Sequence, residues 1–137
     1  MAYWLFKEEP DHYSFDQLFR DKRAVWSGVQ NNLALKHLRS IKKGDGVLYY
    51  HTGKEKAVVG VMAVVKGPYS DPTQDDPRLV VVDVKPVHRF DRPVSLAEIK
   101  ANPKFADFAL VRISRLSIMP VTVTQWNEIE RLSKQSS

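Results

Sequence analysis

The sequence contains no cysteine, and other features that mark common protein classes are missing too. Without thiols the chain can form no disulfide, thiolate metal site or cysteine nucleophile. No apolar run reaches the roughly 20 residues that a membrane-spanning helix needs. Lys7, Glu8 and Glu9 interrupt the apolar start, so we expect no signal peptide. These absences favour a cytoplasmic protein without a membrane partner.

The sequence also lacks the patterns of catalytic and metal sites. The Lys-Gly-Asp-Gly turn at 43–46 is too short for a phosphate-binding P-loop. There is no nucleophile elbow, zincin helix or dinucleotide fingerprint, and the four histidines have no ligand spacing. We therefore expect no catalytic residue, no metal, no cofactor and no enzyme activity.

Basic residues gather in one part of the chain, which has a formal net charge of +5. Only Asp45 and Glu55 oppose the basic residues between positions 36 and 56. Such an excess is typical of a phosphate-binding surface, although it also occurs on solvated surfaces with no partner. The candidate phosphate contacts are Lys36, Arg39, Lys42 and Lys43.

With 137 residues the chain has the size of one domain, which we expect to span 1–137. Aromatic and β-branched residues predict strands, and the third should be buried on both faces. Proline-rich segments predict loops at 67–77 and 91–93, and a frayed tail is expected at 133–137. The predicted strands are 3–7, 46–51, 58–65, 79–87, 110–113 and 116–121.

Helix starts are marked by capping patterns. Ser14, Ser95 and Thr122 are each followed three positions later by Gln or Glu. Asn31 or Asn32 is expected to cap a further helix, with an apolar face at 35 and 38. Strands dominate and the helices are irregularly spaced, which favours an α/β (α+β) fold. We expect a mixed β-barrel of five to six strands with short helices packed outside.

A series of short motifs follows in order along the chain. YWLFKEEP at 3–10 is similar to YWL-x-K-S-E-P, WSGVQN at 26–31 to W-x-G-V-R-N, YYHT at 49–52 to F-Y-H-S, and YSDPT at 69–73 to Y-P-D-P-T. Each motif alone is weak, but their order is specific. Over nearly its whole length the sequence resembles the EVE domain family.

This resemblance implies a PUA-like fold related to YTH and ASCH domains. It further implies a non-enzymatic module, a monomer, that holds a flipped modified base of DNA or RNA, of the modified-cytosine or N6-methyladenine type. A restriction or RNA-modification protein is an implied partner. The alternatives are a general RNA-binding accessory module without modification preference, and a nuclease or base-processing enzyme using Lys7, Glu8 and His51.

Trp26 is the main candidate for stacking on such a base. Taking a base out of its stack costs a few kcal/mol, and an aromatic platform returns roughly 1–3 kcal/mol. Trp26 stands in a loop-like context before Gly28, although a role in the core is the alternative. Trp4 and Trp126 are expected to serve packing.

Residues near Trp26 in the motifs complete the predicted pocket. Gly28 allows close backbone approach, and the backbone amides of 27–29 and the side chains of Asn31 and Asn32 can read a base edge. In the strand at 49–52 one alternating pair should line the pocket, with Tyr49 the better core candidate. Further predicted lining residues are Ser27, Val29, Tyr50, His51 and Thr52.

Three further positions are assigned to the same pocket. Lys7 offers a positive charge at its floor, and Leu79 stands where the family often has Trp. Glu8 replaces the family's usual Ser, and its carboxylate can accept a hydrogen bond from an exocyclic amine. Glu8 is therefore expected to shift the binding preference of the pocket towards amino-bearing bases. These differences from the family's usual residues leave the identity of the base open.

Overall fold

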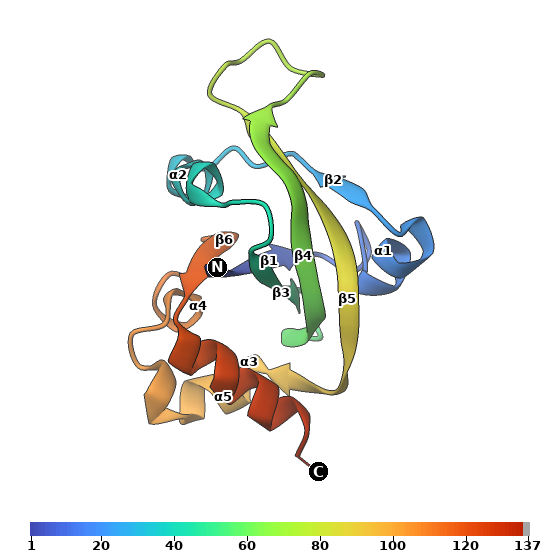
Figure 1. Ribbon diagram of the computed structural model, residues 1–137. Helices are drawn as coiled ribbons and strands as arrows, with labels where there is room; N and C mark the ends of the chain where they lie inside the picture. Colours follow the sequence, from blue (N-terminus) through green and yellow to red (C-terminus); the bar gives the residue numbers. More distant parts are fainter. Residues whose placement is uncertain (136–137) are drawn as a thin grey trace.

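One six-stranded sheet organises the chain, and the computed structural model describes residues 1–135 (Figure 1). The elements follow one another as β1 (Tyr3–Glu8), α1 (Phe15–Asp21), β2 (Ala24–Trp26), α2 (Asn32–Ser40), β3 (Gly46–His51), β4 (Ala57–Ser70), β5 (Val80–Ser95), α3 (Leu96–Ala101), the 3-10 helix η1 (Pro103–Phe105), α4 (Ala109–Arg112), β6 (Ile118–Val121) and α5 (Val123–Ser133).

The strand order is β2-β5-β4-β3-β1-β6, and only β1 and β3 run parallel. The long ribbon of β4 and β5 has four register shifts, which let it bend. The predicted mixed α/β fold is confirmed, but the sheet is open where a barrel was expected. Within residues 1–135 no pairing joins its end strands, β2 and β6.

Helices begin where the capping patterns predicted. Ser95 and Thr122 form complete capping boxes, and the Asn31 side chain accepts from the backbone N–H of Ala34 at 3.0 Å. Ser14 accepts from the N–H of Gln17, but the Gln17 side chain donates to Asp21 instead of returning to Ser14. The cap positions were therefore predictable from residue type.

Three predicted segments differ from the structure. The expected strand 110–113 is helix α4, whose turn is closed by bonds from the N–H groups of Val111 and Arg112 to the Phe108 carbonyl. A short apolar run cannot distinguish strand from helix by periodicity. The expected loop at 67–77 lies partly inside β4, and the expected loop at 91–93 lies wholly inside β5. Pro93 fits in β5 because, within residues 1–135, β5 pairs with β2 only at 82–84. Pro68 fits in β4 because the pairing of β4 with β3 extends only to Ala63.

The C-terminal end is more ordered than expected. Ser133 is a buried residue of α5, and its hydroxyl donates to the Glu130 carbonyl. Residues 136–137 of the predicted tail lie outside the described residues. No helix in the described part of the chain is long and apolar enough to cross a bilayer.

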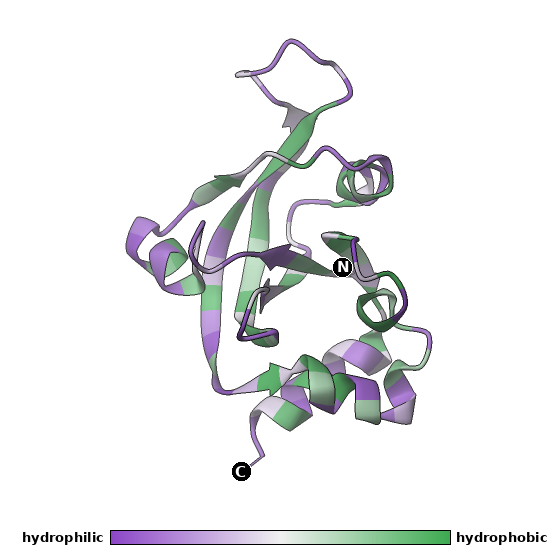
Figure 2. Ribbon diagram, turned by 180° about the vertical axis from the view of Figure 1, so that it is seen from behind, coloured by the Kyte–Doolittle hydropathy of each residue, from purple (hydrophilic) through white to green (hydrophobic). Residues whose placement is uncertain are grey.

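The core lies between the sheet and its helices. Figure 2 shows apolar residues along β3 and β4, and hydrophilic residues in the loop between β4 and β5. The third strand is mostly buried along 58–65, as predicted, and Trp4 and Trp126 are core residues. Asp45 is a buried exception that accepts from the backbone of Ala2 and Lys42 and from the Trp4 indole. Burial alone would raise the pKa of Asp45, but these hydrogen bonds outweigh it and lower that pKa.

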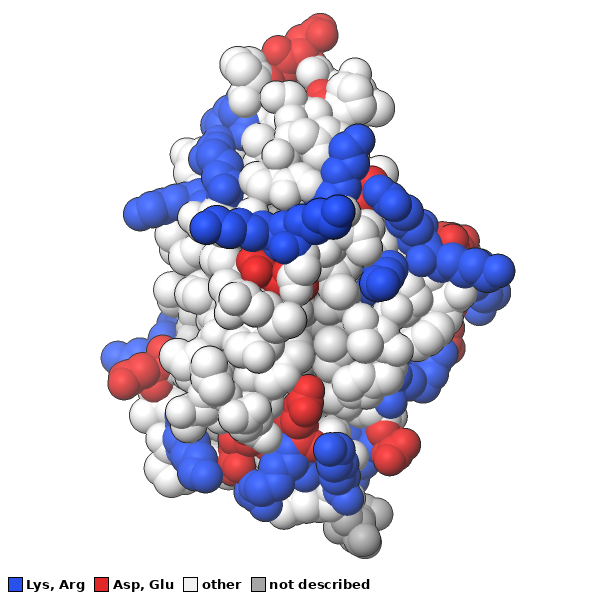
Figure 3. All heavy atoms as spheres, in the orientation of Figure 1, with Lys and Arg blue, Asp and Glu red and all other residues white. Residues whose placement is uncertain are grey.

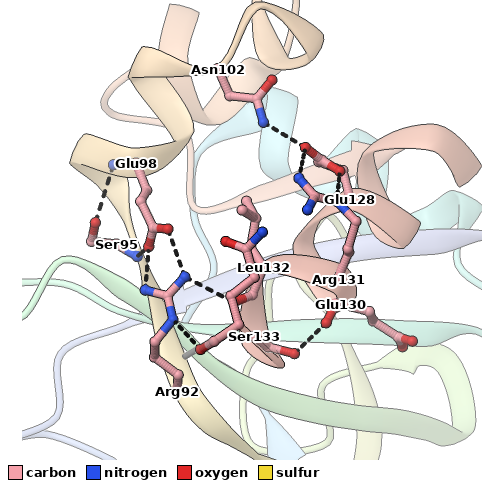
Figure 4. A network of polar contacts seen from close by, with 10 residues as sticks. Arg92, Ser95, Glu98, Asn102, Glu128, Glu130, Arg131, Leu132 and Ser133 are labelled. Carbon is pink, nitrogen blue, oxygen red and sulfur yellow. Dashed lines mark hydrogen bonds and ion pairs between the residues drawn. The ribbon is translucent and has the colours of Figure 1, made fainter. Parts of the chain in front are cut away.

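Two sets of polar contacts connect α5 to the rest of the fold, one through Arg92 and Glu98 and the other through Glu128 (Figure 4). Arg92 of β5 pairs with Glu98 of α3 at 2.7 Å and also donates to the Leu132 carbonyl. Glu128 is buried and accepts from Arg131 and from Asn102. Its bonds to Arg131 and Asn102 outweigh burial and lower the pKa of Glu128 to about 2.

We expect Glu128→Gln to lower the free energy of unfolding at pH 7 by about 1–3 kcal/mol, since Arg131 and Asn102 lose a buried, charged acceptor. The lowered pKa means that Glu128 stabilises the fold above its ordinary pKa, near 4.5, and loses this effect as pH falls towards about 2.

Urea unfolding of both proteins between pH 7 and pH 2 measures this. The gap between wild type and Glu128→Gln should shrink below pH 4.5, and a gap independent of pH would contradict the assignment. Glu130→Gln removes the same charge from the same helix without touching Asn102 or Arg131, so its loss at pH 7 should be smaller.

Candidate functional site

Trp26 is the last residue of β2 and pairs with Val82 of β5. The expected loop-like context is therefore wrong, because three residues here form a short strand against β5. The indole lies 5.2 Å from the Phe6 ring and 5.5 Å from the Tyr49 ring, and the residue is only 6% exposed. Trp26 is thus largely a core residue, and what remains accessible faces a cavity.

That cavity, which we call the first cavity, has a volume of about 320 Å³. It lies where the end of β1, the segment leading into α1, the end of α1 and β2 meet. Its walls combine one indole with both acidic and basic side chains. The lining residues are Glu8, His12, Tyr13, Asp21, Arg23, Ala24, Val25, Trp26 and Ser27.

Asp21 is held in place by two donors. The Tyr13 hydroxyl donates to Asp21 Oδ2 at 2.8 Å, and Gln17 Nε2 donates to Oδ1 at 3.2 Å. Burial, and after it the contact with Asp21, raises the pKa of Tyr13, so this hydroxyl stays protonated at neutral pH. The first cavity therefore has a fixed carboxylate on one wall.

Glu8 supplies a second carboxylate. Its Oε1 accepts from the backbone N–H of Glu9 at 2.9 Å and lies 3.1 Å from His12 Nδ1. Its other oxygen has no hydrogen-bond partner among residues 1–135. The carboxylate is thus anchored through one oxygen and can accept through the other.

The wall beside Trp26 is fixed by a polar cluster. Arg23 Nη2 donates to Asp83 Oδ2 at 2.7 Å, and the Tyr69 hydroxyl donates to Oδ1 of the same carboxylate at 2.5 Å. The hydrogen bond to Asp83 raises the pKa of Tyr69 to about 12. Arg23 is therefore neutralised locally, and the carboxylates of Glu8 and Asp21 dominate the polar character of the first cavity.

The prediction of a single pocket holding both Lys7 and Glu8 is wrong. Neighbours on a strand point to opposite faces, and Lys7 lies with Tyr50 and Thr52 in another cavity, the second cavity. The prediction that one alternating pair of residues 49–52 lines the Trp26 pocket is also wrong, because neither Tyr50 and Thr52 nor Tyr49 and His51 line the first cavity. Tyr49 does pack inward, as expected. Tyr49 is fully buried and its hydroxyl donates to the Tyr13 carbonyl.

His51 does not line the first cavity either. Its Nε2 accepts from the backbone N–H of Phe15 at 3.1 Å, and its Nδ1 lies 2.7 Å from Glu55 Oε1. Both ring nitrogens are thus occupied, one by the start of α1 and the other by the turn between β3 and β4. The sequence places His51 beside Tyr50, and the alternation of the strand separates the two side chains.

The connection from β2 to α2 contains most of the remaining predicted residues. Gly28 has a φ of +81° and an open surface, as its predicted freedom requires, and Val29 packs against the core. Asn31 caps α2, and the Asn32 side chain accepts from Arg78 Nη1 at 2.8 Å. Leu79 packs against the core and lines no part of the first cavity.

The predicted phosphate contacts lie on α2 and the turn after it. Lys36, Arg39, Lys42 and Lys43 are all exposed, and none forms an ion pair in the part of the chain that the structure describes. Arg39 donates to the Arg78 carbonyl. Figure 3 shows basic side chains in a band at the level of α2 and β2, while both signs mix near α3 and α5.

Six residues that line the first cavity were not predicted from the sequence: His12, Tyr13, Asp21, Arg23, Ala24 and Val25. His12 and Tyr13 precede α1, whereas Asp21 ends it and Arg23 precedes β2. The cap at Ser14 indicates where α1 begins, but no spacing in the sequence indicates what the ends of α1 face. Among residues 1–135, no group of three His, Asp or Glu is arranged to hold a metal ion.

Comparison with known proteins places this architecture in a family. The EVE domain family model matches residues 2–132. Mouse thymocyte nuclear protein 1 is 30% identical, covering 96% of this chain and 74% of its own. A solved structure from Rhodopseudomonas palustris is 38% identical with a TM-score of 0.92, covering 97% of this chain and 93% of that one.

The human THYN1 protein, solved in complex with DNA containing 5-methylcytosine, is 27% identical with a TM-score of 0.92 over the whole of both chains. The predicted family is thereby confirmed, and these solved structures share the fold of this chain. The chain belongs to the EVE domain family.

Proposed function

We propose that the chain is a nucleic-acid-binding module that holds a flipped modified base, of the modified-cytosine type, in the first cavity. The observation that carries the proposal is the similarity to human THYN1, whose structure contains 5-methylcytosine DNA. The cavity at Trp26 supports it, because it joins an aromatic wall to hydrogen-bond acceptors.

The packing of Trp26 suits it to receive a base. The ring packs against Phe6 and Tyr49, which are neighbours on β1 and β3, so the ring loses little freedom when a ligand arrives, and preorganisation of this kind favours binding. Contact with an aromatic ring contributes roughly 1–3 kcal/mol per base, which offsets much of the cost of flipping.

The two carboxylates favour a base that carries an exocyclic amine. Glu8 has one free oxygen and Asp21 is fixed by Tyr13. A carboxylate accepts from cytosine N4 but finds no such donor on thymine or uracil. N6-methyladenine also carries an amine, so cytosine is preferred here on the strength of the THYN1 complex.

The basic residues of α2 and its following turn would hold the phosphates. Lys36, Arg39, Lys42 and Lys43 lie next along the chain after the segment that leaves Trp26. Contacts of this kind supply affinity that depends on salt and not on sequence. A module using only these residues would be the alternative, a general RNA-binding domain without modification preference.

The arrangement gives little support to the enzyme alternative. Lys7 and Glu8 line different cavities, and His51 is tied to Phe15 and Glu55. These three side chains therefore do not converge on one substrate. A monomeric state, a cytoplasmic location and a partner from a restriction or RNA-modification system stay predictions.

Trp26→Phe should reduce the preference for 5-methylcytosine over cytosine several-fold, because the smaller ring leaves the 5-methyl group less apolar surface to bury against. Titration of matched oligonucleotides, followed by anisotropy, measures this. Trp126→Phe, at an equally buried indole on α5, is the control and should keep the preference. Equal weakening of all ligands by Trp26→Phe would support the general RNA-binding alternative.

Glu8→Gln should shift preference away from amino-bearing bases, because an amide accepts more weakly than a carboxylate and adds a donor. Oligonucleotides that differ only in cytosine or thymine at the test position give the ratio of affinities. An unchanged ratio would rule out Glu8 as the acceptor.

Lys42→Ala combined with Lys43→Ala should weaken binding of modified and plain oligonucleotides alike. The slope of log affinity against log salt concentration should become shallower, by the amount expected for the loss of up to about two phosphate contacts. Lys134→Ala, on an exposed lysine after α5, serves as the charge control. A selective loss of modified-base binding would contradict a role in backbone contact.

A further inference from the structure

The second cavity lies behind the first, on the other face of β1 and β3. Its volume is about 300 Å³, and it is bounded by the end of β3, the turn before β4, α3 and α4. Three lysines line it, Lys7, Lys56 and Lys100, and no acidic residue does. Neither Lys56 nor Lys100 forms an ion pair within residues 1–135. The charges of Lys56 and Lys100 are therefore not paired with a carboxylate of the described residues.

Tyr50 is a buried polar residue that faces this space without a partner. The residue is only 3% exposed and lines the second cavity. Its hydroxyl makes no hydrogen bond within residues 1–135, but the hydroxyl oxygen is not fully enclosed by protein atoms. The hydroxyl therefore reaches the cavity. Burial raises the pKa of Tyr50, so at neutral pH it stays a hydrogen-bond donor.

The lysines are positioned by the backbone around them. Lys7 Nζ donates to the Ser114 carbonyl at 2.9 Å and lies 5.9 Å from the centre of the Tyr50 ring. Lys56 has a φ of +46°, unusual for a residue with a side chain, and its carbonyl accepts from Leu96 N–H at 2.8 Å. Such outliers persist where surrounding structure imposes them and often accompany function.

We propose that the second cavity binds a phosphate group, held by Lys7, Lys56 and Lys100 with the Tyr50 hydroxyl as a further donor. Lysine is a common phosphate ligand as a point charge, and a lining with cationic donors and no carboxylate favours an anion. Apolar side chains of Leu96, Leu110 and Val111 on the remaining wall leave room for an organic portion of a phosphate ester. This site is separate from the proposed base site, since Lys7 and Glu8 point to opposite faces of β1.

Titration with inorganic phosphate at low salt, followed by two-dimensional amide NMR, tests the proposal. Phosphate should shift the amide signals of Thr52, Gly53 and Lys56. Lys56→Ala combined with Lys100→Ala should weaken phosphate binding about tenfold or more, because two charges are lost. Tyr50→Phe keeps the ring and should weaken it several-fold.

The charge control is Lys85→Ala combined with Lys134→Ala, two exposed lysines outside the cavity. It should leave phosphate affinity unchanged. The proposal is overturned if no shifts appear at these amides up to about 20 mM phosphate. It is also overturned if the control and the cavity variant weaken binding equally.

A competition experiment identifies the source of the phosphate. An oligonucleotide that displaces phosphate from the Thr52 and Gly53 signals would place a nucleic-acid phosphate in the cavity. Simultaneous binding of oligonucleotide and a nucleoside monophosphate would indicate a small phosphorylated molecule. Both outcomes support the phosphate site. Neither depends on the result for Trp26→Phe, so the phosphate site and the base site are tested separately.

Discussion

The Trp26 indole packs against two neighbouring rings, Phe6 of β1 and Tyr49 of β3, with ring centres 5.2 and 5.5 Å away. This packing joins the short edge strand β2 to the middle of the sheet. Tyr49 in turn donates to the Tyr13 carbonyl, which anchors the segment entering α1. The elements around the first cavity are thus positioned through one aromatic cluster.

A consequence is that stability and recognition share the same side chain. A ring that is 6% exposed contributes to the core over most of its surface and can offer a ligand only what faces the cavity. Its orientation is set before any ligand arrives, which lowers the entropic cost of binding. Removing the ring altogether would leave a core cavity that costs about 3–5 kcal/mol, so stacking and folding can be separated only by conservative changes.

The alternation of side chains along β1 gives the domain two different faces. Glu8 faces the first cavity with the acceptor Asp21, and Lys7 faces the second with other lysines. One cavity is rich in acceptors and the other in donors, although the two residues are adjacent in the sequence. The sheet separates these groups, so each cavity can select a ligand of different charge.

The fold was largely predictable from local sequence, because caps and strand patterns are local properties. Ser95, Thr122 and Asn31 begin helices as their side-chain oxygens indicate. The segment 110–113 was misjudged because a short apolar run is compatible with both helix and strand. The open edge of the sheet was also not predictable, since it depends on which distant strands pair.

The candidate site was predictable only in part. Glu8, Trp26 and Ser27 do line the first cavity. Lys7, Tyr50 and Thr52 were assigned to it because they belong to the motifs, yet their side chains line the second cavity. Tyr13 and Asp21 were missed because their approach depends on where α1 packs, which no motif records.

The proposed function requires that the accessible part of Trp26 contacts the flipped base. A protein carrying Trp4→Phe and Trp126→Phe keeps Trp26 as its only indole, and its fluorescence can be followed while an oligonucleotide is added. Contact with the base should quench this fluorescence more strongly for 5-methylcytosine than for plain cytosine at equal saturation. Unchanged Trp26 emission, while anisotropy shows that the oligonucleotide is bound, would contradict it.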